Sequence, residues 1–223
     1  PGARVSASGA ASDGRHRGGD VATAGAALAA ARAAVILLHG RGATAAGILE
    51  LAPELAAPGL AFLAPQAALG TWYPLSFLAP LEANQPWLDS ALAAVGDLAD
   101  AIAATSLPAA RLALVGFSQG ACLATEFVAR NPRRYGALAA FVGGRIGPPG
   151  TRFAAQGDLA GTPVLVAAGD PDPHVPWSRV EETASNLEAM GARVTRRRRP
   201  GFPHSIHPED LATARELLAA LTI

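Results

Sequence analysis

Short, uninterrupted apolar runs recur along the chain and alternate with longer segments that mix apolar and polar residues at helical spacing. Such runs are typical of strands that are buried on both faces of a parallel sheet. They predict strands at residues 33–38, 60–64, 112–117, 138–142, 163–168 and 192–199. The segments between them predict helices at residues 45–56, 86–105, 121–130, 176–190 and 208–221. This alternation predicts an α/β fold, with a mostly parallel central sheet covered by helices on both faces.

The chain length predicts one folded domain. A length of 223 residues suits a single α/β domain and leaves little room for a large lid. Residues 1–20 are rich in glycine, alanine, serine and arginine, so we expect a flexible N-terminal arm followed by the domain at residues 21–223. The arm lacks the apolar core of a signal peptide, which predicts a cytoplasmic protein. Residues 66–84 combine aromatic side chains with glycine and prolines, and this predicts an irregular surface loop.

The charge balance and the cysteine count exclude several classes of function. Basic and acidic residues number 18 each, so no bulk attraction to nucleic acid is expected. The basic run at 196–199 is either an anion-binding patch or an outer strand with solvated arginines, and its lack of interleaved aromatics favours the strand. No membrane span is expected, because Arg32 interrupts the most apolar stretch, residues 22–38. Cys122 is the only cysteine, which excludes an internal disulfide and a cysteine-based metal site and predicts a small buried residue.

The most informative motif is the sequence GFSQG at residues 116–120, which an apolar run enters and a helix-like run leaves. A serine between two glycines at a strand-to-helix turn is typical of the nucleophile elbow of α/β-hydrolases. The glycines let strand and helix approach closely, and the sharp turn exposes the hydroxyl of Ser118 above the sheet. The alternative is a chance match, because the motif is short and the chain contains 24 glycines.

A serine nucleophile needs a base and a carboxylate, and the order of residues along the chain supplies both. In this fold the acid and the histidine follow later strands, in that order. Asp170 and Asp172 follow the strand expected at 163–168, and His204 follows the last one. We favour Asp172 as the acid, because Asp170 directly follows a glycine and is suited to supporting the turn. His207 is the rival base, but it precedes a proline and is expected at the start of the last helix.

Two backbone N–H groups are expected to stabilise the oxyanion of the transition state. One belongs to Gln119, directly after the serine, and the other to Arg41, in the glycine-flanked loop after the first strand. His39 precedes this loop and is expected to brace it by hydrogen bonds. His174 is expected near the pocket entrance, and His16 within the arm.

These motifs resemble those of the phospholipase/carboxylesterase family, which includes bacterial carboxylesterases and acyl-protein thioesterases. The resembling segments are LHGRG at 38–42, GFSQG at 116–120, GDPDPHVP at 169–176 and PHSI at 203–206. The resemblance extends from about residue 33 to the end of the chain. It implies the α/β-hydrolase fold without a large lid, no cofactor, and the hydrolysis of small esters or acyl thioesters. It also places the acid on Asp172, the base on His204, and the oxyanion donors on the backbones of Arg41 and Gln119.

The sequence therefore predicts a serine carboxylesterase that cleaves small acyl or aryl esters through an acyl-enzyme. The loop TWYP at 71–74 is more similar to the bacterial carboxylesterases than to the protein-depalmitoylating enzymes, and this favours small esters. The alternatives are thioesterase or lysophospholipase activity, an acyltransferase or perhydrolase, and a non-catalytic binding protein. The expected partner is a small ester, with a homodimer as a further option, and no metal is expected.

Seven loop residues are candidates for the walls of the substrate pocket, because they lie near the expected site. They are Trp72, Tyr73, Phe77, Ile146, Val175, Trp177 and Phe202. Ordinary packing is an equally good interpretation for each of them.

Overall fold

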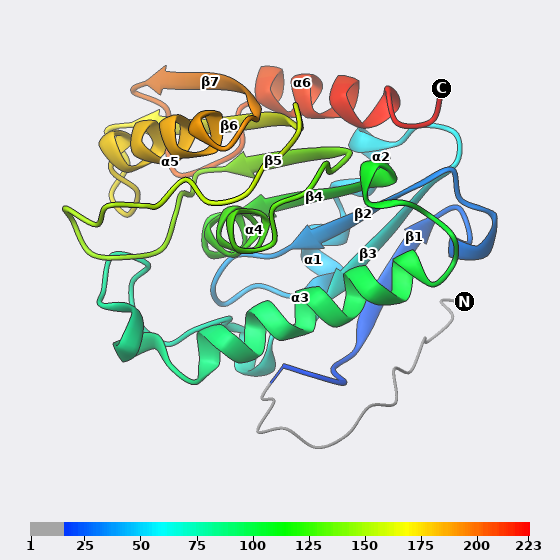
Figure 1. Cartoon of the computed structure of the whole chain (residues 1–223), viewed down its shortest axis with the longest axis horizontal. Coiled ribbons are helices and arrows are strands. Elements are labelled where there is room, and N and C mark those ends of the chain that lie inside the picture. The colour runs from blue at the N-terminus through cyan, green and yellow to red at the C-terminus, as the bar shows by residue number, and fades with distance from the viewer. Residues whose placement is uncertain (1–15) are drawn as a thin grey trace.

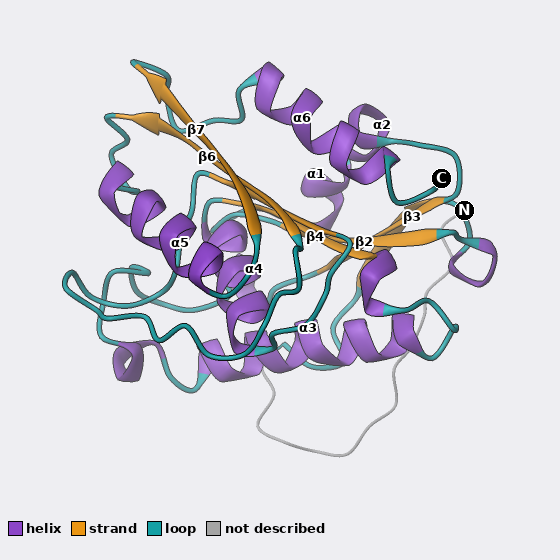
Figure 2. Cartoon of the chain, turned by 45° about the horizontal axis from the view of Figure 1, so that its top comes forward, coloured by secondary structure: helices purple, strands orange, loops and turns teal. Residues whose placement is uncertain are grey.

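The computed structural model describes residues 16–223, which form one seven-stranded sheet with helices on both faces (Figures 1 and 2). The strands are β1 (Val21–Gly25), β2 (Ala33–Leu38), β3 (Leu60–Pro65), β4 (Leu112–Phe117), β5 (Ala137–Phe141), β6 (Pro163–Asp170) and β7 (Arg193–Pro200). Their order across the sheet is β1-β3-β2-β4-β5-β6-β7. Only the pair β1–β3 is antiparallel among the described strands. The predicted fold class, an α/β protein with a mostly parallel sheet, is confirmed.

The helices bury two separate hydrophobic clusters, one on each face of the sheet. They are α1 (Ala45–Leu49), α2 (Ala52–Leu55), α3 (Trp87–Ala103), α4 (Gln119–Arg130), α5 (Trp177–Ala189) and α6 (Pro208–Ala219). Helices α3, α4 and α5 cover one face, whereas α1, α2 and α6 cover the other (Figure 2). Strand side chains alternate between the two clusters, and Ile36 and Leu38 accordingly face the first while Val35 and Leu37 face the second.

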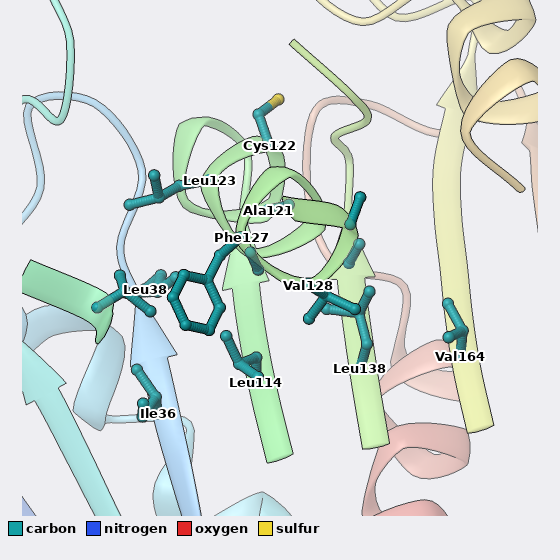
Figure 3. Close-up of a cluster of buried hydrophobic side chains, with 14 of the residues drawn as sticks. Ile36, Leu38, Leu114, Ala121, Cys122, Leu123, Phe127, Val128, Leu138 and Val164 are labelled. Atoms are coloured by element: carbon teal, nitrogen blue, oxygen red, sulfur yellow. The ribbon is translucent and has the colours of Figure 1, made fainter. Parts of the chain in front are cut away.

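Helix α4 lies directly against the centre of the sheet. Its residues Phe127 and Val128 pack on Leu114 and Leu138, which come from two neighbouring strands (Figure 3). Residues 119–129 of this helix are all buried. Ser118, the N-cap of α4, is therefore joined directly to a helix that is buried along almost its whole length, which fixes its position.

The structure differs from the sequence-based prediction in two elements. The helix expected at 45–56 is broken into α1 and α2, because the ring of Pro53 would clash with the carbonyl of Leu49 in a continuous helix. Strand β1 was not expected, since its five residues are only half-buried and end in glycine. It adds an antiparallel edge to the sheet through its pairing with β3. In the described part of the chain, none of the helices is both long and apolar enough to cross a membrane.

Residues 16–20 of the expected arm are described, with His16 buried and 17–20 exposed, whereas the expected flexible arm at 1–15 lies outside the described residues. His16 is buried, and its backbone N–H donates to the hydroxyl of Ser90 at 3.1 Å. Its ring lies between Trp72 and Trp87, with centroids 5.6 and 5.5 Å away. Arg17 forms an ion pair with Asp97 on α3. The described part of the arm is therefore attached to the domain through His16 and Arg17.

The arginine run at 196–199 lies on β7, the strand at one edge of the sheet. Arg196 pairs with Glu188, Arg198 with Asp170, and Arg199 with both Asp210 and Glu209. Three of the four guanidinium groups are thus already neutralised by carboxylates of this chain. This supports the interpretation as an outer strand over the anion-binding patch, and charged side chains also protect an exposed strand edge.

Candidate active site

Ser118 follows β4 and precedes α4, in a strained backbone conformation with φ 53° and ψ −117°. Two glycines make this turn possible. A Cβ atom at Gly116 would lie 2.4 Å from the carbonyl oxygen of Gly120, and one at Gly120 would lie 2.1 Å from that of Leu38. The backbone N–H of Ser118 donates to Phe141 at the end of β5, at 2.9 Å. The strain is therefore held by neighbouring strands, as is usual for residues at active sites.

Three side chains from distant parts of the chain meet at this turn. The hydroxyl Oγ of Ser118 lies 2.9 Å from Nε2 of His204, and Nδ1 of His204 lies 2.8 Å from Oδ2 of Asp172. Since a carboxylate only accepts, Nδ1 carries the proton and Nε2 is free to accept from the serine. This arrangement can take a proton from the hydroxyl and stabilise the resulting imidazolium.

The carboxylate of Asp172 is held on both oxygens. Its Oδ1 accepts from the backbone N–H groups of His174 and Val175, each at 2.8 Å, while Oδ2 accepts from His204. The Asp172 side chain is fully buried, whereas 21% of the His204 side chain is exposed. The loop therefore holds a buried carboxylate against a partly exposed imidazole.

The two rival residues lie elsewhere. Asp170 pairs with Arg198 at the ends of β6 and β7. His207 is the N-cap of α6, where its Nδ1 accepts from the backbone N–H of Glu209 at 3.3 Å. The structure therefore brings Asp172 and His204 to Ser118 and gives Asp170 and His207 structural contacts instead.

The loop that carries His204 lies tightly against the end of β6. The N–H of Gly201 donates to Asp170 at 2.9 Å, and a Cβ atom at Gly169 would lie 2.1 Å from the carbonyl oxygen of Phe202. The His204 ring is flanked by the rings of Phe117 and His174, at 5.3 and 5.1 Å. These contacts restrict the orientation of the imidazole and place His174, which is exposed, at the rim of the site.

The loop after β2 borders the serine on its other side. A Cβ atom at Gly40 would lie 3.5 Å from Cβ of Ser118. Within residues 16–223, the backbone N–H groups of Arg41 and Gln119 both lack a protein acceptor. Arg41 follows Gly40 and Gln119 follows Ser118, so two unpaired donors in adjoining segments are available to a negatively charged oxygen.

His39 braces this loop with both ring nitrogens. Its Nδ1 donates to the carbonyl of Gly40 at 2.8 Å, and its Nε2 accepts from the N–H of Ala67 at 3.1 Å. Burial lowers the pKa of His39, which keeps the imidazole neutral and suited to this pair of bonds.

The family model described as phospholipase/carboxylesterase matches residues 23–222. The chain belongs to the phospholipase/carboxylesterase family. A phospholipase/carboxylesterase from Dyadobacter fermentans is 45% identical, with a TM-score of 0.85 over 89% of this chain and 95% of that one. Esterase PE8 is 28% identical, with a TM-score of 0.71 over 89% and 97%. Acyl-protein thioesterase 2 from Zea mays, 20% identical with a TM-score of 0.70 over 92% and 99%, shares the fold.

The protein is therefore an ester-cleaving serine hydrolase with the α/β-hydrolase fold and no large additional domain. In the described residues, histidine, cysteine and carboxylate side chains do not gather in threes as a metal site would require. Burial raises the pKa of the Cys122 thiol to about 12, so this residue of the esterase is a packing element and not a second nucleophile.

Most of the residues expected as pocket walls are buried in the core of the esterase. Six of them belong to the cluster between the sheet and α3–α5: Trp72, Tyr73, Phe77, Ile146, Val175 and Trp177. Trp72 is 0% exposed and Tyr73 is 1% exposed, so neither offers a surface to a ligand. Their burial favours the packing interpretation for both residues, and Ile146 is buried to the same extent. Phe202 is half-buried, with its ring 4.7 Å from that of His207.

A buried ionic network that was not expected from the sequence surrounds Glu126. Glu126 on α4 accepts from Arg145 at 2.8 Å and from Arg130 at 2.7 Å. Burial alone raises the pKa of Glu126, but the two guanidinium groups together lower it below its usual value. Arg179 on α5 donates to the carbonyls of Arg145 and Gly147. The network anchors the loop after β5. In the sequence, its only indication is a glutamate within an otherwise largely apolar helix.

Proposed function

We propose that the protein is a serine carboxylesterase that hydrolyses small acyl or aryl esters, with Ser118 as nucleophile, His204 as base and Asp172 as the orienting acid. The observation that carries this proposal is the continuous hydrogen-bonded series from Oγ of Ser118 through the imidazole to the buried carboxylate. Nucleophile, base and orienting group within hydrogen-bond distance are what acyl transfer requires.

The first half-reaction forms an acyl-enzyme. As Oγ of Ser118 attacks the ester carbonyl, its proton moves to Nε2 of His204, and Asp172 stabilises the imidazolium. The carbonyl oxygen becomes an oxyanion that accepts hydrogen bonds from the two free backbone N–H groups, those of Arg41 and Gln119. The C–O bond to the alcohol then breaks, and the alcohol leaves with the proton from His204.

The second half-reaction releases the acid. A water molecule attacks the acyl carbon while His204 accepts one of its protons, and the same two N–H groups stabilise the second oxyanion. When the bond to Ser118 breaks, the serine oxygen takes back the proton. The carboxylic acid leaves, and the enzyme returns to its starting state.

Small esters are the substrates that the surroundings of the site favour. The fold carries no large additional domain to enclose a long ligand, and the aromatic residues of the 66–84 loop are mostly packed inward. The 45% identical structure is described as a phospholipase/carboxylesterase, which agrees with ester hydrolysis. Acyl thioesters are the second candidate, because acyl-protein thioesterase 2 from Zea mays shares the fold.

A substrate panel with an active-site probe tests the proposal. The panel contains p-nitrophenyl esters of graded acyl length, an acyl thioester of matched length, and a competing alcohol to detect acyl transfer. We expect the highest kcat/KM on short esters and covalent labelling of Ser118 by a fluorophosphonate. Ser118→Ala should lose both activity and label. Normal hydrolysis by Ser118→Ala, or a wild-type protein that neither labels nor turns over, would overturn the proposal.

A further inference from the structure

Residues 70–75 form a short segment, here called the strap, that is hydrogen-bonded to both segments bordering Ser118. Arg41 binds it with two guanidinium nitrogens: Nη1 donates to the carbonyl of Pro74 at 2.7 Å and Nη2 to that of Leu75 at 2.5 Å. The Arg41 guanidinium carbon also lies 6.0 Å from the centre of the Tyr73 ring. A planar guanidinium that binds two consecutive carbonyls holds both in a fixed direction.

Gln119, the residue after Ser118, binds the same strap. Its Oε1 accepts from the backbone N–H of Trp72 at 2.9 Å, and its Nε2 donates to the carbonyl of Tyr73 at 2.8 Å. The Gln119 side chain is buried and uses its acceptor and its donor on the backbone of one segment. The Gln119 side chain therefore holds the backbone of two consecutive strap residues, Trp72 and Tyr73, with one hydrogen bond each.

Two further bonds tie the strap to the loop after β2. The N–H of Gly42 donates to Gly70 at 2.7 Å, and Nε1 of Trp72 donates to the carbonyl of His39 at 2.8 Å. The strap is therefore attached both to the loop that contains Arg41 and to the start of α4 that contains Gln119. These are the two segments that carry the free N–H groups and adjoin Ser118, one through Gly40 and one through the chain itself.

We propose that the strap is a brace that fixes the two oxyanion donors relative to each other, and that the side chains of Arg41 and Gln119 are positioning groups for their own backbone N–H groups. The inference rests on the proposed function. The physical reason is that oxyanion donors act only when they are held in place before the charge develops. The donor of Arg41 sits on a loop, which needs external attachment to reach that precision.

Side-chain substitution separates the two roles, because it leaves the backbone donors in the chain. For Arg41→Ala we expect kcat on p-nitrophenyl acetate to fall about 10- to 100-fold, less than the loss of a complete oxyanion donor. KM should change by less than about threefold, since the brace acts on the transition state. Arg41→Lys should restore part of kcat, because one ammonium can reach one of the two carbonyls.

A transition-state analogue provides the readout that a purely structural role would not change. A trifluoromethyl ketone forms a hemiketal with the serine whose oxyanion occupies the hole, so its Ki should rise by the factor by which kcat/KM falls. Arg32→Ala is the matched control, because the Arg32 guanidinium also donates to a backbone carbonyl, that of Thr222 at 3.0 Å. Arg32 directly precedes β2, at the end of the strand opposite to the loop that contains Arg41. It should leave kcat and Ki unchanged.

The double variant Arg41→Ala/Gln119→Ala tests whether the two side chains act as one brace. Residues that act as a unit are not additive, so its kcat should be close to that of the worse single variant. Multiplicative losses, a raised KM with unchanged kcat, or a Ki that stays constant would overturn the inference. Failure of the proposed function looks different, because the wild-type protein itself would then neither label nor turn over. Should Arg41→Ala fail to fold, Arg41→Lys and Gln119→Ala give the same comparison.

Discussion

Asp172 and His204 are separated by 32 positions in the chain, yet Oδ2 of one lies 2.8 Å from Nδ1 of the other. The parallel pairing of β6 with β7 explains this closeness. Gly169 lies opposite Arg199, and Asp170 lies opposite Pro200, so the two strands end side by side and their loops leave the sheet together. The topology of the sheet, and not any local preference, therefore assembles the acid with the base.

The first prediction concerns the choice between the two aspartates. Asp172→Asn should lower kcat about 10⁴-fold, because an amide can no longer orient the imidazole in the tautomer that accepts the serine proton. Asp170→Asn is the matched variant two positions away, and it breaks only the partly exposed pair with Arg198, worth at most about 1 kcal/mol. Steady-state kinetics on a short p-nitrophenyl ester compare the two. The reverse ranking would show that the acid is misassigned.

How far the sequence predicts this molecule depends on which forces set each feature. The strands at 33–38 and 112–117 were predictable because they are apolar at every position, and the order of serine, acid and histidine followed from strand ends that meet at one edge. Strand β1 was not predictable, because it forms through pairing with β3 and its partly buried residues give only a weak hydrophobic pattern in the sequence. Pro53 indicates the break between α1 and α2, but the apolar residues around it keep a helical spacing, which favours one continuous helix.

The aromatic loop shows why side-chain direction is harder to predict than chain path. Trp72 points inward because its Nε1 donates to the carbonyl of His39 and its backbone N–H donates to the side chain of Gln119. Both partners lie far from Trp72 in the sequence and come close to it only in the folded chain. The loop itself was visible in the sequence, but these hydrogen bonds were not. The burial of Glu126 could not be predicted for the same reason, because its partner Arg145 belongs to the loop after β5 and contacts it only in the folded chain.

The second prediction is a pH effect on stability through His39. Burial lowers the pKa of His39 in the folded protein. Its Nε2 accepts a hydrogen bond from the N–H of Ala67, so a proton on Nε2 would replace this bond with a repulsive contact between two N–H groups. Above about pH 6.5 the ring is neutral in both states and its contribution is complete. As the pH falls below that value the unfolded chain binds the proton more readily, so the free energy of unfolding decreases.

Urea unfolding of wild type and His39→Gln between about pH 7 and pH 5.5 measures this effect, since the window lies at the ordinary histidine pKa. The wild type should lose stability across the window more steeply than the variant. Glu126 does not interfere, because a carboxylate with a lowered pKa loses its contribution only on further acidification. Equal slopes for the two proteins would contradict the assignment.

The third prediction concerns the buried ion pair of Glu126 and Arg145. Glu126→Gln leaves the Arg145 guanidinium, whose side chain is 10% exposed, without a compensating charge. We expect a loss of about 3 kcal/mol in the free energy of unfolding, as is usual when one partner of a buried pair is removed. Asp97→Asn is the control, because its pair with Arg17 is exposed and should contribute less than about 1 kcal/mol. Similar losses for both variants would mean that burial does not set the strength of the pair.

The fourth prediction compares two helical glycines that differ only in their surroundings. A Cβ atom at Gly120 would lie 2.1 Å from the carbonyl oxygen of Leu38, a backbone atom that cannot move aside. Gly120→Ala should therefore push α4 away from β2, at a cost of about 3 kcal/mol. The displacement would also move the backbone N–H of Gln119 away from the oxyanion, so activity should fall along with stability.

Gly96→Ala provides the contrast, because a Cβ atom there would meet only Cε2 of Phe127, at an ordinary contact distance of 3.7 Å. In the middle of α3, alanine should raise the free energy of unfolding by about 0.5–1 kcal/mol through its better helix propensity, with kcat unchanged. Thermal unfolding and esterase assays on both variants measure the difference. If Gly120→Ala is as stable and active as Gly96→Ala, then α4 and β2 are not in the close contact that holds Ser118 above the sheet.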